Sequence, residues 1–106
     1  MSLPPPDPIG ATLDMLGIPD TLTNRQQLDV MFRALKIYVN RNEQRGDLWA
    51  SFDVADATHH VRSKAARLMH SVTQPTPSAE AEALDSALDG INYNVFAARY
   101  LLGLMP

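Results

Sequence analysis

The residues best suited to chemistry in this sequence are carboxylates on its last long helical segment. Asp85, Asp89 and Asn92 are spaced at i, i+4 and i+7, so on a helix they line one stripe. Glu43 lies at the end of an earlier helical pattern and would face this stripe if the two helices run antiparallel. Mg²⁺ prefers hard oxygen ligands of this kind, with waters and phosphates completing its coordination. These residues are therefore a candidate magnesium site.

These polar residues also have a purely structural interpretation. Asp85 would favour the positive end of the helix dipole, and Glu43 lies in a polar segment that water would solvate. Lys64 and Arg67 are three residues apart on one helical face and suit phosphate oxygens. The same spacing also suits a solvated face with salt bridges, so both interpretations remain open.

Three aromatic residues could stack on a nucleotide base, namely Trp49, Tyr93 and Tyr100. Such residues also serve as core or interface anchors with a polar tip. His59 and His60 are adjacent and point about 100° apart on a helix, which does not suit one shared metal ion. The sequence has no Walker motif, no zinc-protease motif and no nucleophile–base pair, so covalent catalysis is not expected.

The elements that must position these residues are helices. Apolar residues recur at helical spacing, and no segment alternates over the length of a strand. Thr23 and Gln26 fit a capping box for the second helix, and Thr76-Pro77 fits the start of the last. The fold class is therefore all-α, with three long helices and a short N-terminal one, at about residues 7–17, 24–45, 50–72 and 76–104.

Each long helix has a predicted inner stripe. The stripes are Leu28, Phe32, Leu35 and Val39; then Val54, Thr58, Val61, Ala65, Leu68 and Val72; then Leu84, Leu88, Ile91, Val95, Ala98 and Leu102. The last helix has a second face of small residues, and a helix that is apolar on two sides usually packs between neighbours. We therefore expect a homodimer whose helical bundle is completed by the second copy.

Composition narrows the function classes. The 106 residues suffice for one small domain, which we place at 7–106 after a disordered lead-in over 1–6. The net charge of −3 gives no electrostatic footprint for duplex nucleic acid. No apolar run reaches the roughly 20 residues that span a bilayer, so no membrane partner is expected. The absence of cysteine excludes a thiolate zinc site and fits a cytoplasmic location.

Three motifs, in order, carry a family resemblance. They are Gly46-Asp47-Leu48-Trp49, Lys64-Ala65-Ala66-Arg67-Leu68, and Asp89-Gly90-Ile91-Asn92-Tyr93 with Asp85 one turn earlier. Together they resemble the nucleotide-modification-associated domain 1 family of phages and bacteria. That family is similar to the MazG-like all-α nucleoside triphosphate pyrophosphatases.

The resemblance implies Mg²⁺-dependent hydrolysis of a (deoxy)nucleoside triphosphate, in the setting of phage nucleotide metabolism. It implies Glu43, Asp85 and Asp89 as metal ligands, with Glu43 or Asp85 as general base. Substrate contacts would come from Lys64, Arg67, Asn92, Trp49 and Tyr93. The Glu-Glu-x-x-Glu signature of the larger family is absent, and Arg45 stands where a tyrosine is usual. Two alternatives remain: a non-catalytic nucleotide- or protein-binding module, and a purely structural or interaction protein.

Overall fold

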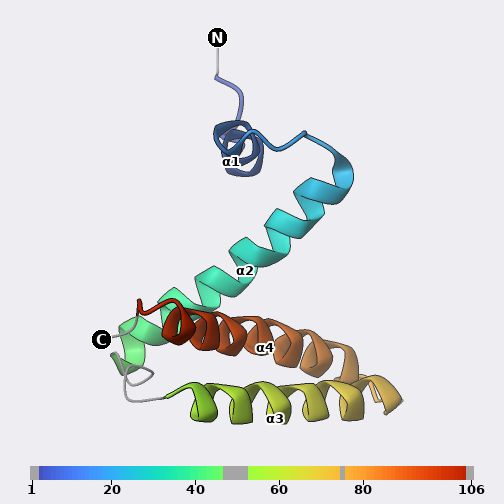
Figure 1. The fold of residues 1–106 in the computed structure, drawn as a ribbon. Helices are drawn as coiled ribbons and strands as arrows, with labels where there is room; N and C mark the ends of the chain where they lie inside the picture. The colour runs from blue at the N-terminus through green and yellow to red at the C-terminus, as the bar shows by residue number, and fades with distance from the viewer. Residues whose placement is uncertain (1–2, 47–52, 75, 105–106) are drawn as a thin grey trace. The chain divides into compact units, whose positions relative to one another are not determined.

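The computed structural model describes residues 3–46, 53–74 and 76–104, and all regular structure in these ranges is helical. The helices are α1 (Pro8–Leu16), α2 (Leu22–Arg45), α3 (Val54–Thr73) and α4 (Ala79–Leu101), as Figure 1 shows. The predicted all-α fold with three long helices and a short N-terminal one is confirmed. None of the helices in the described part of the chain is both long and apolar enough to cross a bilayer.

The chain divides into two compact units, residues 1–33 and 34–106, with the boundary inside α2. In the first unit, α1 begins and ends as predicted. The Asp7 carboxylate accepts a hydrogen bond from the Gly10 amide, and Pro8 occupies the first helical position. Gly17 ends the helix with a φ of 67°, in the left-handed region that favours glycine.

Arg25 ties the start of α2 to the residues around α1. Its guanidinium lies 2.9 Å from the Asp7 carboxylate and 2.5 Å from that of Asp20. These hydrogen bonds from Arg25 lower the pKa of both aspartates. The sequence patterns did not single out this three-residue cluster, because the two acids lie 18 and five residues before the arginine.

The predicted starts of α2 and α4 were each displaced by two residues. For α2, the Thr21 hydroxyl accepts the Asn24 amide, so Thr21 caps the helix in place of Thr23. For α4, the helix begins at Ala79, and residues 77–78 form a turn before it. The Ala79 amide donates to the Thr76 carbonyl, so this turn leads directly into the first helical residue.

The start of α3 has a capping box that the sequence analysis did not identify. The Asp53 carboxylate accepts the Asp56 amide at 2.8 Å, and the Asp56 carboxylate accepts the Asp53 amide at 3.1 Å. Each acid satisfies a backbone donor that the helix itself leaves free. The first predicted residues of this helix, 50–52, lie outside the described residues.

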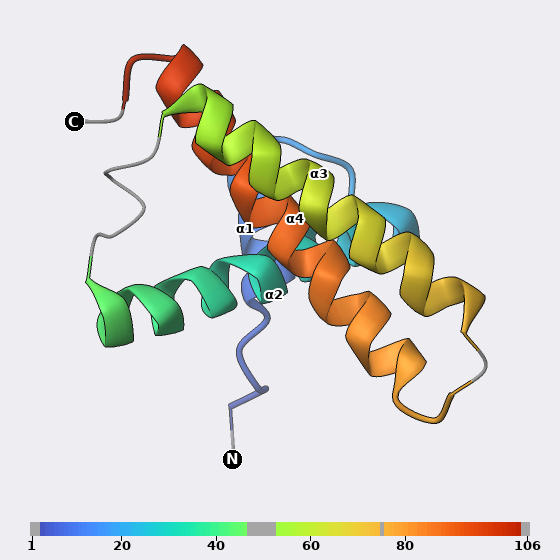
Figure 2. The same ribbon diagram turned by 90° about the horizontal axis from the view of Figure 1, so that it is seen from below.

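α3 and α4 run antiparallel and side by side in both views (Figures 1 and 2). Small residues allow this close approach: Ala57, Ser71, Ala79 and Ser86 are all buried. A Cβ added to Gly90 would lie 3.9 Å from the Lys64 Cβ, an ordinary contact distance.

The predicted apolar stripes of α3 and α4 are only partly buried. On α4, Leu88 is buried, but Leu84, Val95 and Leu102 are 54%, 47% and 72% exposed. On α3, Val72 is 63% exposed, whereas Ser71 beside it is buried. The expectation that these stripes form the interior of the chain is therefore met only in part: Leu88 is buried, and Val61, Leu68 and Ile91 are half-buried. Of the polar residues predicted beside the stripes, Asp89 is buried, because two cations satisfy its charge.

Candidate functional site

The centre of the second unit is a buried carboxylate, Asp89 on α4, which is only 3% exposed. Its Oδ1 lies 2.5 Å from Arg41 Nη1 on α2, and its Oδ2 lies 3.0 Å from Lys64 Nζ on α3. Burying a charge is costly unless it is paired and hydrogen-bonded, and here each oxygen has its own cation. Asp89 thus joins three helices through one side chain.

Asn92 makes a second polar connection, three residues further along α4. Its side-chain Nδ2 donates to the Ala34 carbonyl of α2 at 2.9 Å. The residue that we predicted to contact a base therefore holds the backbone of a neighbouring helix.

Aromatic rings continue the same contact between helices. The Tyr93 ring on α4 stacks on His60 of α3 with centroids 4.5 Å apart and an interplanar angle of 10°. Tyr93 also meets Phe96 edge to face at 5.7 Å, and Phe96 meets Tyr38 of α2 at 5.8 Å. In this arrangement Tyr93 anchors the helix contact, which is the alternative that its residue type left open.

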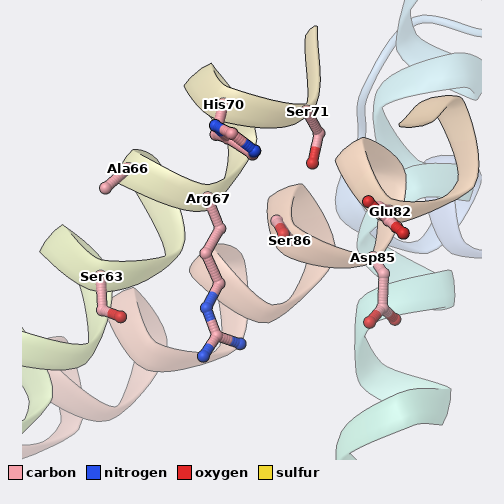
Figure 3. A pocket seen from close by; sticks show the side chains of 8 residues that line it. All are labelled: Ser63, Ala66, Arg67, His70, Ser71, Glu82, Asp85 and Ser86. Atoms are coloured by element: carbon pink, nitrogen blue, oxygen red, sulfur yellow. The ribbon is translucent and has the colours of Figure 1, made fainter. Parts of the chain in front are cut away.

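A pocket of about 520 Å³ lies beside this network, between α3 and α4. It contains two of the predicted site residues, Arg67 and Asp85. Figure 3 shows that the other lining residues come from both helices: Ser63, Ala66, His70 and Ser71 from α3, and Glu82 and Ser86 from α4.

The pocket offers polar groups of several kinds. Arg67 and His70 provide nitrogen donors, and the carboxylates of Glu82 and Asp85 provide acceptors. Ser71 and Ser86 are buried, so their hydroxyls lie in the inner part of the wall. Such a lining can hydrogen-bond a small polar ligand, with the guanidinium of Arg67 suited to a phosphate or carboxylate group.

The predicted magnesium ligands are distributed over different surroundings. Asp89 is engaged by Arg41 and Lys64, Asp85 lines the pocket, and Glu43 is exposed on α2. Among residues 3–46, 53–74 and 76–104, no group of three or more His, Cys, Asp or Glu side chains could hold a metal ion. The magnesium site stays a prediction. Trp49 lies outside the described residues.

Arg41 is the residue of this network that sequence reasoning missed. It lies in the polar segment that also contains Glu43, at the end of the second helix. A usable signal was present, because an aspartate at the edge of a helix that is apolar on two sides needs a partner when buried. Sequence spacing does not say which of the cations on other helices provides that partner.

No protein-family model, no curated protein and no solved structure matches this chain. The resemblance to the nucleotide-modification-associated domain 1 family and to the MazG-like enzymes therefore stays a prediction.

Proposed function

We propose that this protein is a helical interaction module that functions as a homodimer. The supporting observation is its small apolar core. Among the described residues, the buried hydrophobic side chains are Leu13, Leu88, Phe96 and the three alanines Ala34, Ala57 and Ala79. Alanine side chains contribute little apolar area. A chain of this length normally buries well over half of the surface that its unfolded state exposes.

The exposed apolar side chains supply what the core lacks. Large hydrophobic residues are exposed on every long helix, including Leu35 at 53% on α2, Met69 at 66% on α3 and Leu84 at 54% on α4. Single exposed apolar residues are common on protein surfaces, but rows of them mark interaction sites. Of the buried residues of α3 and α4, only Leu88 and Phe96 are large and apolar, so a second copy is the source of apolar contact that the proposal requires.

The oligomeric state of the full chain tests this proposal directly. We expect sedimentation velocity and light scattering to give a dimer mass at micromolar concentrations, with dissociation on dilution. The melting temperature should also rise with protein concentration, because association stabilises only the folded state. A monomer mass at every concentration up to the solubility limit, with a melting temperature independent of concentration, would contradict the proposal.

A second candidate function is nucleotide binding at the α3–α4 pocket, favoured by the presence of Arg67 with three serines. We expect a deoxynucleoside triphosphate at 100 times its Kd to stabilise the fold by about 2.7 kcal/mol. Arg67→Ala should abolish this stabilisation, whereas Arg33→Ala, which removes an equally positive charge from outside the pocket, should not. Pyrophosphate release with Mg²⁺ or Mn²⁺ would extend the candidate to the hydrolase that the family resemblance implies. Its absence would leave a binding role.

A further inference from the structure

α4 presents an apolar stripe on the side turned away from its buried charge. The stripe comprises Leu84, Leu88, Ile91, Val95, Ala98 and Leu102. Its centre lies about 140° around the helix from Asp89, at about 100° per residue. Leu88 at the margin of the stripe is already buried, but Leu84, Val95 and Leu102 are exposed. Within the second unit, neither α3 nor residues 34–45 of α2 cover these three side chains.

The spacing of the stripe suits a partner helix. Its members follow one another at intervals of four, three, four, three and four residues, which is the heptad pattern of helices that pack in pairs. This series reads the same in both directions. Two copies placed antiparallel therefore match along the whole stripe, with Leu84 opposite the partner's Leu102 and Ile91 opposite the partner's Val95.

Charges beside the stripe select the antiparallel arrangement. Asp85 and Arg99 each follow a stripe residue directly, so they flank the stripe on the same side, near its opposite ends. Antiparallel pairing brings Asp85 close to the partner's Arg99, and the twofold symmetry repeats this contact. Parallel pairing in register would instead bring Asp85 close to the partner's Glu80, and like charges repel.

We infer that the α4 stripe is the homodimer interface and that the two α4 helices pack against each other there in antiparallel orientation. This inference rests on the proposed function and adds the surface and the orientation. The buried Asp89 network keeps α2 and α3 on the opposite side of α4, which leaves the stripe available to the second copy.

Cross-linking tests the orientation, and the chain helps because it contains no native cysteine. Leu84 and Leu102 lie 18 residues apart, about 27 Å along a helix. We expect Leu84→Cys protein mixed with Leu102→Cys protein to form a covalent heterodimer with a short bis-maleimide. Neither variant alone should cross-link. Efficient cross-linking of each variant with itself, without a cross-linked heterodimer in the mixture, would overturn the antiparallel arrangement.

A charge on the stripe tests the surface. Val95→Glu should weaken dimerisation at least about tenfold, because the new carboxylate would be buried without a partner. Met69→Glu is the matched control: it places the same charge at a 66% exposed apolar position on α3 and should leave the dimer intact. Circular dichroism would verify that both variants remain helical.

The outcomes separate this inference from the proposed function. A wild-type protein that is monomeric at all concentrations would contradict both the proposed function and this inference. A wild-type dimer that Val95→Glu leaves unchanged, and that Met69→Glu dissociates, would retain the homodimer and overturn the α4 interface.

Discussion

Replacing the buried carboxylate of Asp89 with an amide is the sharpest test of how this fold is held together. Asp89→Asn retains the shape of the side chain and removes its charge. The side chain is 4% exposed and meets two cations, Arg41 at 2.5 Å and Lys64 at 3.0 Å. The substitution leaves both cations without their carboxylate.

The cost follows from the exposure of those cations. Removing one partner of a buried ion pair typically costs about 3–5 kcal/mol, because the remaining charge is buried and uncompensated. The side chain of Lys64 is 18% exposed and that of Arg41 is 40% exposed, so water reaches both in part. We therefore expect Asp89→Asn to lower the free energy of unfolding by about 2–3 kcal/mol, below the typical range. Lys64→Met should cost more than Arg41→Met, because the lysine is the more buried.

Urea unfolding followed by circular dichroism measures the change, at one fixed protein concentration because association adds to stability. Hydrogen exchange should locate the lost protection in α3 and α4. Asp14→Asn is the matched control: it removes the same charge at an exposed position of α1 and should change stability by less than about 0.5 kcal/mol.

A combined substitution distinguishes the ion pair from general damage to the core. Lys64→Met with Asp89→Leu replaces the pair with apolar side chains, a change that is often neutral or stabilising. It should recover most of the stability that Asp89→Asn loses. If Asp89→Asn unfolds at the same urea concentration as the wild type, the network does not hold the helices together and the reasoning fails.

Four further predictions concern other positions of the chain. Gly90→Ala should raise the free energy of unfolding by about 0.5–1 kcal/mol, since the nearest side-chain atom would be 3.9 Å away and alanine favours helix. Gly10→Ala should lower the melting temperature despite the same helical gain, because its Cβ would collide with the Asp7 carboxylate and lie 2.9 Å from Arg25 Nη2. At low pH the Arg25 cluster should weaken, because Arg25 lowers the pKa of its two aspartates. Their stabilisation is present above the unfolded-state pKa of about 3.9 and is lost as the pH falls further. Urea titrations of Arg25→Gln should therefore show a smaller loss of unfolding free energy in acid than those of the wild type. Burial and the charges of nearby aspartates raise the pKa of Tyr100, so stability should fall above about pH 10. The fall should be smaller in Tyr100→Phe. Equal losses of stability in both proteins would contradict this assignment.

Local signals in the sequence were sufficient where the chain acts on its own neighbours. Asp7-Pro8 and Gly17 predicted both ends of α1, because a cap, a fixed φ and a left-handed φ each depend on a few adjacent residues. The same kind of reasoning misplaced the cap of α2, because Thr21 and Thr23 each carry a hydroxyl group that can cap a helix and residue type does not distinguish them. It also did not identify the capping box that Asp53 forms with Asp56.

In the candidate site, too, sequence patterns predicted some features and only the three-dimensional contacts decided others. Among the residues selected by type and spacing, Asp89, Lys64, Asn92 and Tyr93 make contacts between helices, Arg67 and Asp85 share a pocket, and Glu43 is exposed; their predicted roles stay predictions. Spacing did not distinguish a carboxylate that holds a metal from one that holds two cations. That distinction depends on which side chains of other helices come within about 4 Å, the usual distance limit for an ion pair.

The sequence by itself determined an all-α chain with one short and three long helices, because helical periodicity and end signals act over a few residues. Tertiary structure alone decided which face of each helix is interior. Periodicity favoured the apolar stripes, but the carboxylate of Asp89 lies in the interior with Arg41 and Lys64 as partners, whereas Leu84, Val95 and Leu102 are exposed. The physical reason is that a buried charge must meet its partners, and those partners lie 48 and 25 residues away along the chain.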